Sequence, residues 1–267
     1  MSEYLLSRRQ APELERARLA LLQALYDPLT ARQLDAIGIR AGWRCLDVGA
    51  GAGSVTAMLG HRVGATGSVL AVDLDTSLLQ QMASDRIRVR RHDLMTDPLP
   101  PDAFDLVHAR LLLMHLPSRL DALRRLVRPL RPGGWLAAID PDFTTVALWP
   151  FNLIWERIWS SFCDALLAGG WDPRYGARLS RDLQAVGLVD VQADYVVSRD
   201  LGGSIRPRLL SLTLERLRDR MLALGADGEE IDEARRLLAD PANTITSETS
   251  CVARARRPLP PARSATS

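Results

Sequence analysis

Apolar and polar positions change period along the chain, from helical spacing to short continuous runs and back. Near the N-terminus, apolar residues at helical spacing predict a helix over residues 13–26 and a second over residues 30–37, ending at Gly38. Short apolar runs bounded by turn residues then alternate with stretches of helical period. Strands are expected at residues 44–48, 68–73, 87–91, 104–108, 135–140, 189–197 and 250–254, and helices at 55–62, 77–84, 118–130 and 176–186.

This alternation of strands and helices predicts an α/β protein. Repeated strand-then-helix units with short turns favour a doubly wound, mostly parallel sheet with helices on both faces. We expect N-terminal helices in residues 1–41, a sheet domain over residues 42–257, and a helical cap inserted at about residues 142–175. The Pro-, Ala- and Ser-rich tail of residues 258–267 is expected to be disordered.

Composition narrows the classes of function. The chain has 267 residues, enough for one large domain with a cap, and a net charge of +2, which argues against a dedicated nucleic-acid surface. Every basic residue is arginine, so lysine-based Schiff chemistry is excluded. The three cysteines, Cys45, Cys163 and Cys251, are widely separated and odd in number, and suggest neither a disulfide framework nor a zinc site. We predict no metal.

The most informative segment follows the first predicted strand and reads Leu46-Asp47-Val48-Gly49-Ala50-Gly51-Ala52-Gly53. Glycines allow a sharp turn and a close approach of the backbone to a nucleotide-like ligand. A nicotinamide fingerprint would need glycine or alanine at position 54, where Ser54 stands. Asp47 is a poor neighbour for a pyrophosphate but suits a ligand with an ammonium and a sulfonium group. A glycine turn without ligand remains the alternative for this segment alone.

Acidic residues also stand where successive strands are expected to end. Asp47 closes the first strand, Asp73 the second, and Asp93 follows the third. The Asp73 carboxylate can accept hydrogen bonds from both hydroxyls of a ribose. A single such acid is as readily a turn residue or a helix cap, as expected for Asp75 before Ser77. Three of them beside the glycine turn predict a ligand site at the carboxyl edge of the sheet.

The glycine segment and these acids resemble the motifs of class I S-adenosylmethionine-dependent methyltransferases. Residues 104–110 and 130–134 resemble the fourth strand of that family and the turn before its fifth, and the resemblance covers about residues 4–200. It implies a Rossmann-like fold and S-adenosylmethionine as cofactor. In the small-molecule branch, which includes natural-product and quinone enzymes, an N-terminal helix folds over the cofactor. The implied cofactor-binding residues are Asp47, Gly49, Gly51, Gly53, Asp73, Leu74, Asp93, Leu94, Arg110 and Tyr4.

Within that resemblance, the Asp93 carboxylate is expected to take the exocyclic amine of adenine, and the Leu94 amide to face the ring. Methyl transfer asks the protein mainly to align the acceptor and exclude water, and a general base helps with a hydroxyl or acidic carbon. His115 lies in a loop expected to face the methyl group, so we select it as a base or acceptor-orienting group. A histidine that only fixes the loop is an equal alternative.

More than half of the aromatic residues fall between Phe143 and Tyr175. Trp155, Trp159 and Phe162 share one helical face, which predicts either a packing face, a homodimer contact or a wall for a hydrophobic acceptor. An amphipathic stretch over residues 208–238 would form a second wall. Together they suggest an enclosed apolar pocket.

The sequence therefore predicts an S-adenosylmethionine-dependent methyltransferase that acts on an oxygen or carbon nucleophile of a small hydrophobic metabolite, in natural-product biosynthesis. One alternative is a cofactor-binding protein that promotes a cyclisation or senses the metabolite. Another is an RNA or protein methyltransferase, disfavoured by the charge balance, and a nicotinamide oxidoreductase is a distant fourth. With neither a signal peptide nor an apolar run of spanning length, the chain is expected to be cytoplasmic, without a membrane span or nucleic-acid partner.

Overall fold

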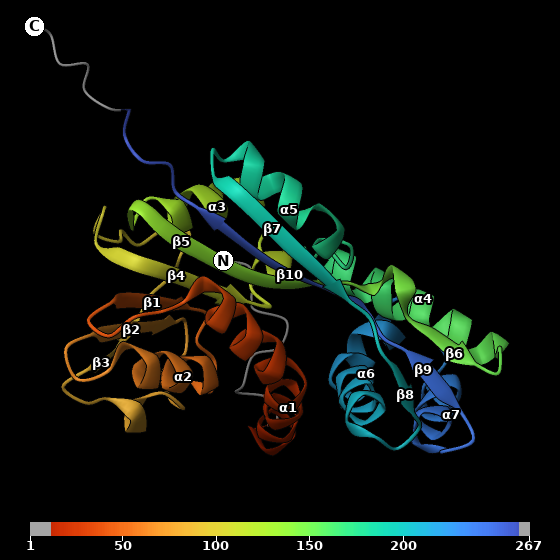
Figure 1. Cartoon of the computed structure of the whole chain (residues 1–267). Helices are drawn as coiled ribbons and strands as arrows, with labels where there is room; N and C mark the ends of the chain where they lie inside the picture. The colour runs from red at the N-terminus through yellow and green to blue at the C-terminus, as the bar shows by residue number, and fades with distance from the viewer. Residues whose placement is uncertain (1–11, 262–267) are drawn as a thin grey trace, which may run out of the picture.

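The computed structural model describes residues 12–261 and contains a seven-stranded sheet of order β3-β2-β1-β4-β5-β10-β7 (Figure 1). Strands β3, β2, β1, β4 and β5 are mutually parallel, whereas β10 is antiparallel to both β5 and β7. This confirms the α/β fold with a mostly parallel sheet. The strands are β1 Arg44–Val48, β2 Ser68–Asp73, β3 Ile87–Arg91, β4 Phe104–Arg110, β5 Leu130–Asp142, β7 Val189–Val196 and β10 Thr249–Arg256.

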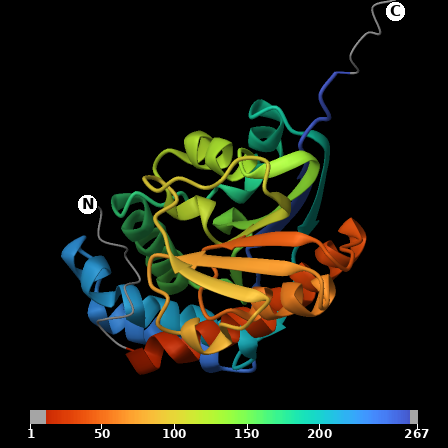
Figure 2. The ribbon, with the colours of Figure 1, turned by 90° about the vertical axis from the view of Figure 1, so that its left-hand side faces the viewer.

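Helices cover both faces of this sheet (Figure 2). Helices α1 (Pro12–Ile37) and α2 (Ser54–Val63) pack on one face, and α3 (Arg119–Val127) and α5 (Gly176–Ala185) on the other. Alternate residues of a strand point to opposite faces. Accordingly, Cys45 of β1 packs with the α1 and α2 side chains, and its neighbour Leu46 belongs to the core that includes α3 and α5.

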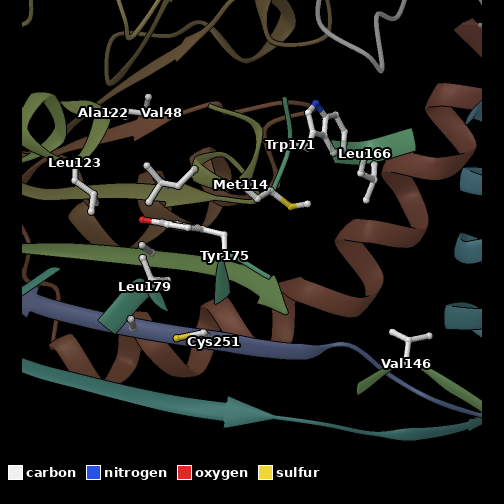
Figure 3. Packing of buried hydrophobic residues seen from close by; sticks show 14 of the residues in the cluster. Val48, Met114, Ala122, Leu123, Val146, Leu166, Trp171, Tyr175, Leu179 and Cys251 are labelled. Carbon is white, nitrogen blue, oxygen red and sulfur yellow. The ribbon is translucent and has the colours of Figure 1, made fainter. Parts of the chain in front are cut away.

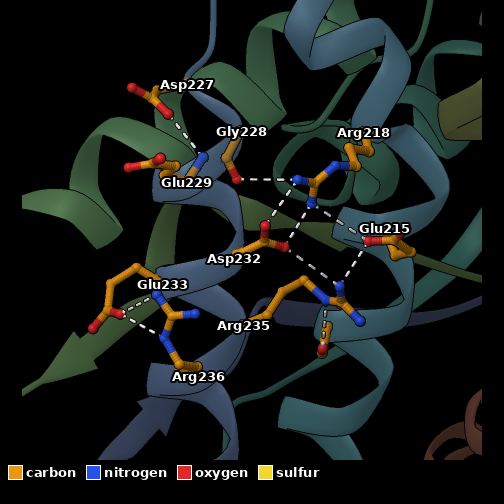
Figure 4. A network of polar contacts seen from close by, with 10 residues as sticks. Glu215, Arg218, Asp227, Gly228, Glu229, Asp232, Glu233, Arg235 and Arg236 are labelled. Carbon is orange, nitrogen blue, oxygen red and sulfur yellow. Dashed lines mark hydrogen bonds and ion pairs between the residues drawn. The ribbon is translucent and has the colours of Figure 1, made fainter.

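A second, smaller layer stands beyond the carboxyl ends of the strands. Its sheet has the order β6-β9-β8, formed by β6 (Ala147–Trp149), β9 (Thr244–Thr246) and β8 (Arg199–Leu201). Helices α4 (Leu153–Ala168), α6 (Ile205–Ala223) and α7 (Gly228–Ala239) pack together beside it (Figure 1). On the outer side, Arg218 of α6 pairs with Asp232 of α7 at 2.7 Å, within the network drawn in Figure 4. The chain passes between the two sheets four times, from β5 to β6, β6 to β7, β7 to β8 and β9 to β10.

Two of the predicted helices differ from the structure. The helices expected at residues 13–26 and 30–37 form one helix, α1, which continues through Pro28. Pro28 loses one backbone hydrogen bond, but burial of Tyr26, Leu29 and Leu34 on either side of it holds the helix against the protein. The prediction of two separate helices was wrong because this packing outweighs the tendency of a proline to end a helix.

The helix predicted at residues 77–84 is also wrong. Only the short 3-10 turn η1 (Gln80–Met82) forms there, although the Asp75 carboxylate accepts the Ser77 amide at 2.9 Å, as a cap would. Leu79 is the one residue of this segment in the buried core, so the segment has no apolar stripe that would stabilise a longer helix.

Several other strands and helices begin or end at residues different from those predicted. Strand β5 begins at Leu130 and runs through the turn expected at residues 132–134, with a register shift against β4 between Phe104 and Leu106. Helix α3 correspondingly ends at Val127 instead of residue 130. Residues 131–134 have no partner in register on β4 or β10, and Gly133 has a φ of 77°, so the expected turn lies within the strand as a bulge.

Helix α5 approaches the end of β5 unusually closely. An added Cβ at Gly176, the first residue of α5, would lie 2.5 Å from the Pro141 carbonyl carbon and 2.6 Å from the Asp140 oxygen. Figure 3 shows the buried cluster that this approach creates, in which Tyr175 and Leu179 lie between Leu123 and Cys251. The close approach fixes the strand end that borders the site described next.

Two properties bear on the environment of the protein. No helix within residues 12–261 combines the length and the apolar character that a membrane span requires. The three cysteines have free thiols, and Cys45 and Cys251 are buried core residues.

Candidate active site

One continuous cavity of about 970 Å³ lies at the carboxyl edge of the parallel strands. Its wall is built from the glycine loop after β1, the ends of β2 and β4, the loop after β4, helix α1 and helices α4 and α6. Most of the predicted site residues are brought together in this wall, namely Asp47, Gly49, Gly51, Asp73, Leu74, Asp93, Leu94, Arg110 and His115. Gly53 does not line the cavity, and Tyr4 lies outside the described residues.

The glycine loop is held against the end of β2. The amides of Gly49 and Ala50 donate to the Val72 carbonyl at 2.9 and 3.1 Å, and the Gly51 amide donates to Oδ2 of Asp73 at 2.8 Å. Gly49 and Gly51 have φ of 69° and 61°, a conformation that side-chain-bearing residues avoid. The backbone of this loop therefore forms part of the cavity wall.

Gly53 serves the fold rather than the wall. It caps α2 with a φ of 88°, and an added Cβ would lie 2.1 Å from Sδ of Met82 in η1. The third glycine of the motif is thus required where the loop packs on η1. The sequence pattern alone does not separate a glycine that faces a ligand from one that faces a neighbouring segment.

The two outer acids are fixed by backbone amides. Oδ1 of Asp73 accepts the Asp75 amide at 3.0 Å, and Oδ1 of Asp93 accepts the Met95 amide at 2.8 Å. The Asp93 amide in turn donates to Asp97 at 2.9 Å, while the Leu94 side chain is buried beside it. Both carboxylates stand at neighbouring strand ends, as the sequence predicts.

Asp47 is in the wall but is engaged with the protein. Its Oδ2 accepts the Thr56 hydroxyl of α2 at 2.7 Å, and its Oδ1 lies 2.9 Å from Nδ1 of His108 in β4. The Asp47 and His108 side chains are both nearly inaccessible to solvent. Both oxygens of the Asp47 carboxylate therefore have protein partners. The sequence reading did not identify His108 as the partner.

Arg110 connects three elements around the glycine loop. Its guanidinium donates to Asp27 of α1 at 2.8 Å, to Thr30 at 3.0 Å and to the Ser54 hydroxyl at 3.1 Å. Ser54 also donates to Asp27 at 2.8 Å. This arrangement joins α1 and the start of α2 to the end of β4, so the long N-terminal helix is fixed to the glycine loop.

His115 reaches the cavity from the loop after β4. Its ring lies edge-on to Trp171 with ring centres 3.7 Å apart. Burial, helped by the charge of Arg18, lowers the pKa of His115 to about 3, so the imidazole is neutral at physiological pH. Beneath this loop, the buried carboxylate of Asp140 accepts the amides of Leu113 and Met114 at 3.3 and 3.1 Å.

The aromatic face of α4 is divided between the cavity and the core. Phe162 lines the cavity together with Phe143 and Trp171, whereas Trp155 is fully buried and stacks on Trp159 with ring centres 5.4 Å apart. From α6, Leu209 and Leu210 complete an apolar wall, in the stretch for which the sequence predicts one. The stripe is thus both a packing face and a cavity wall.

Several charged or polar wall residues were not identified from the sequence: Glu15, Arg18, Tyr26, Arg206 and Glu248. Arg18 forms a two-point pair with Glu15, with both hydrogen bonds at 2.8 Å. Tyr26 and Glu248 are 222 positions apart in the chain, so no local pattern connects them. Among the described residues, no group of three or more His, Cys, Asp or Glu side chains is arranged to hold a metal ion.

Comparison with known proteins agrees with this geometry. Residues 46–138 match the family model described as "Methyltransferase domain". The chain is 34% identical over 119 residues to a ubiquinone/menaquinone biosynthesis C-methyltransferase of Pseudomonas fluorescens, a match that covers 42% of this chain and 46% of that protein. It is 35% identical over 101 residues to methyltransferase str3 of Strobilurus tenacellus, which covers 38% of this chain and 36% of the relative.

A solved structure extends the likeness in fold. Phosphoethanolamine N-methyltransferase 2 of Haemonchus contortus, in complex with phosphomonomethylethanolamine and S-adenosylhomocysteine, superposes with a TM-score of 0.58 at 16% identity, over 88% of this chain and 54% of that one. The matches to the curated relatives span about half of their length or less. The resemblance to class I methyltransferases that the sequence indicates is confirmed over residues 46–138.

Proposed function

We propose that this chain, in which residues 46–138 match the family model described as "Methyltransferase domain", transfers a methyl group from S-adenosylmethionine to a small metabolite with a hydrophobic body. The nucleophile would be an oxygen or carbon atom, and the reaction would belong to natural-product biosynthesis in the cytoplasm. The observation that carries the proposal is a single cavity with two chemically different ends: a glycine loop with three strand-end acids, and an aromatic wall.

The residues at the first end fit the cofactor. Asp73, held by the amides of Gly51 and Asp75, offers two oxygens to the hydroxyls of a ribose. Asp93 and Leu94 would meet adenine, and the backbone of Gly49 and Gly51 would contact the amino-acid part. The buried charge of Asp47 favours a cationic ligand at this edge. When bound, the cofactor supplies an electrophilic methyl group on a sulfonium.

The protein's own contribution at the other end is placement of the acceptor and exclusion of water. Phe143, Phe162 and Trp171 would provide apolar surface around the acceptor, and α1 contributes Leu22 and Tyr26 to the cavity wall. Burial lowers the pKa of His115 to about 3, so the ring is a weak base, and we assign it the orienting role, as a neutral hydrogen-bonding group beside the acceptor. Tyr4, which the resemblance implies as a cofactor contact, remains part of this proposal.

Calorimetry with S-adenosylmethionine, followed by incubation of the protein with labelled cofactor and a panel of hydrophobic phenols and carbon acids, tests the proposal. We expect binding of the cofactor and formation of S-adenosylhomocysteine with at least one acceptor class. Asp73→Asn should weaken cofactor binding by about tenfold, since a charge-assisted hydrogen bond is lost. Asp121→Asn, on the exposed surface of α3, is the matched control and should bind normally.

Two outcomes would overturn the proposal. One is indifference to S-adenosylmethionine together with binding of a dinucleotide. The other is cofactor binding with conversion of an acceptor but without S-adenosylhomocysteine, which is the result that a cyclase would give.

A further inference from the structure

Part of the cavity wall is charged, and neither cofactor binding nor the aromatic cap explains it. It consists of Tyr26 of α1, Arg206 of α6 and Glu248, which lies between β9 and β10. All three line the cavity, and their exposed fractions are 3%, 8% and 3%, respectively. We call these three residues the polar wall.

Hydrogen bonds within the polar wall converge on one atom. The Tyr26 hydroxyl donates to Oε1 of Glu248 at 2.7 Å, and Nη1 of Arg206 donates to the same oxygen. Nε of Arg206 donates to Asp200 at 3.0 Å. The Arg206 guanidinium therefore lies between the carboxylates of Glu248 and Asp200. Two carboxylates carry more negative charge than one guanidinium can balance, and they offer more acceptor positions than Tyr26 and Arg206 have donors.

The unmet capacity belongs to Glu248. An ionised carboxylate offers about four lone-pair positions on two oxygens. Within residues 12–261, two hydrogen bonds are donated to this carboxylate, and both end on Oε1. Because the Glu248 side chain lines the cavity, Oε2 is the oxygen that a ligand could reach. Leu22, Leu209 and Leu210 line the same cavity, so this acceptor position opens onto a largely apolar space in which a ligand's donor group would form a charge-assisted hydrogen bond.

We propose that the polar wall binds a hydrogen-bond donor, a hydroxyl or a protonated amine, on the acceptor molecule, through the Glu248 carboxylate. The acceptor is therefore amphipathic: its apolar body contacts Phe143, Phe162 and Trp171, and its donor group contacts the polar wall. An acceptor that ends in a carboxylate is disfavoured by the negative charge. This inference rests on the proposed function and specifies its substrate class.

Four probes with the same ten-carbon chain test it: decanol, decylamine, decyl methyl ether and decanoate. Each is titrated into protein saturated with S-adenosylhomocysteine, and binding is followed by calorimetry and by tryptophan fluorescence, because Trp171 lines the cavity. We expect decanol, decylamine or both to bind about tenfold more tightly than the ether and decanoate, as a charge-assisted hydrogen bond implies. The ratio between decanol and decylamine distinguishes a hydroxyl from an ammonium ligand.

Glu248→Gln should reduce this preference to within about twofold, because the carboxylate charge is lost. Glu230→Gln is the matched control: this glutamate of α7 pairs with Arg157 outside the cavity, and the variant should keep the wild-type preference. If Glu248→Gln fails to fold, Tyr26→Phe provides the second test. This change removes one donor from Oε1 but leaves the Glu248 carboxylate in place, so the variant should keep the preference for donor probes.

The inference is overturned by equal affinities for the four probes in the wild-type protein, including no measurable binding of any. It is equally overturned by a folded Glu248→Gln variant that keeps the preference, or by a Tyr26→Phe variant that loses it. Affinity for S-adenosylmethionine and formation of S-adenosylhomocysteine are measured separately. The inference can therefore fail while the proposed function stands.

Discussion

The Asp140 carboxylate accepts a hydrogen bond from the backbone amide of Met114, over 3.1 Å, in a site without access to solvent. Asp140 lies near the end of β5, and Met114 lies in the loop that brings His115 into the cavity. The position of this loop relative to the sheet thus depends on one buried acid. Burial raises the pKa of Asp140 from 3.8 to about 7, against the opposing effect of the two amide hydrogen bonds.

The raised pKa of Asp140 predicts a specific dependence of stability on pH. The folded state favours protonated Asp140, so its contribution to stability is full below about pH 4 and is lost as the pH rises through about 7. Asp140→Asn, which cannot ionise, should gain about 4 kcal/mol of unfolding free energy relative to wild type between about pH 4 and about pH 8, because the pKa is raised by about three units. Urea unfolding at both pH values measures it. A difference that does not vary with pH would refute the assignment.

His115 should not appear in the pH profile of the reaction. Its pKa is lowered to about 3, chiefly by burial, so it stays neutral across the range in which the enzyme is assayed. His115→Ala should slow methyl transfer by about tenfold or more through loss of an oriented contact, with affinity for S-adenosylmethionine nearly unchanged. Rates measured from about pH 5 to about pH 9 check this. A titration near the ordinary histidine pKa that disappears in the variant would instead identify a general base.

The pairing of Asp47 with His108 and Thr56 predicts a large cost for removing the carboxylate. Asp47→Ala leaves two buried groups without their partner, and should lower the unfolding free energy by about 3 kcal/mol. Asp47→Asn keeps one acceptor and should cost less. Chemical denaturation of both variants gives the comparison, and equal stabilities for wild type and Asp47→Ala would contradict the buried pairing.

Gly176 should be irreplaceable for reasons of space. Gly176→Ala places a Cβ within 2.5 to 2.7 Å of the β5 backbone and should destabilise the fold by about 2 kcal/mol or more. Gly228→Ala is the matched control: Gly228 is likewise the first residue of its helix, but the nearest atom to an added Cβ there is 3.4 Å away. Thermal unfolding of the two variants would argue against this packing if their midpoints fell equally.

Local signals were sufficient for the part of the fold around the glycine loop. Strands β1, β2 and β3 have the predicted bounds, because β1 and β2 are short, mostly apolar runs, β3 alternates apolar and polar residues, and each is followed by an acid or a turn within a few residues. The small sheet was missed, since β6, β8 and β9 have three residues each and are stabilised only by one another and by the helices around them. Such short strands have no period that a sequence pattern could reveal.

The site shows the same limit. Asp73 and Asp93 were identified because strand ends at one sheet edge necessarily converge. His108, the hydrogen-bond partner of Asp47, lies 61 positions away in the chain. It is recognised only once β1 and β4 are paired in register. The polar wall joins residues from the two ends of the chain. Its chemistry depends on tertiary packing that neither composition nor spacing specifies.

Strand β10 lies between β5 and β7, although it is the latest of the described strands along the chain. During translation, β5 and β7 therefore leave the ribosome long before the segment that joins them. In a nascent chain that stops before Thr249, the edges of β5 and β7 that face β10 have no partner strand. Once the chain extends through Arg256, β10 pairs with both edges. Premature termination near this strand should consequently yield aggregation and proteolysis instead of a shortened enzyme.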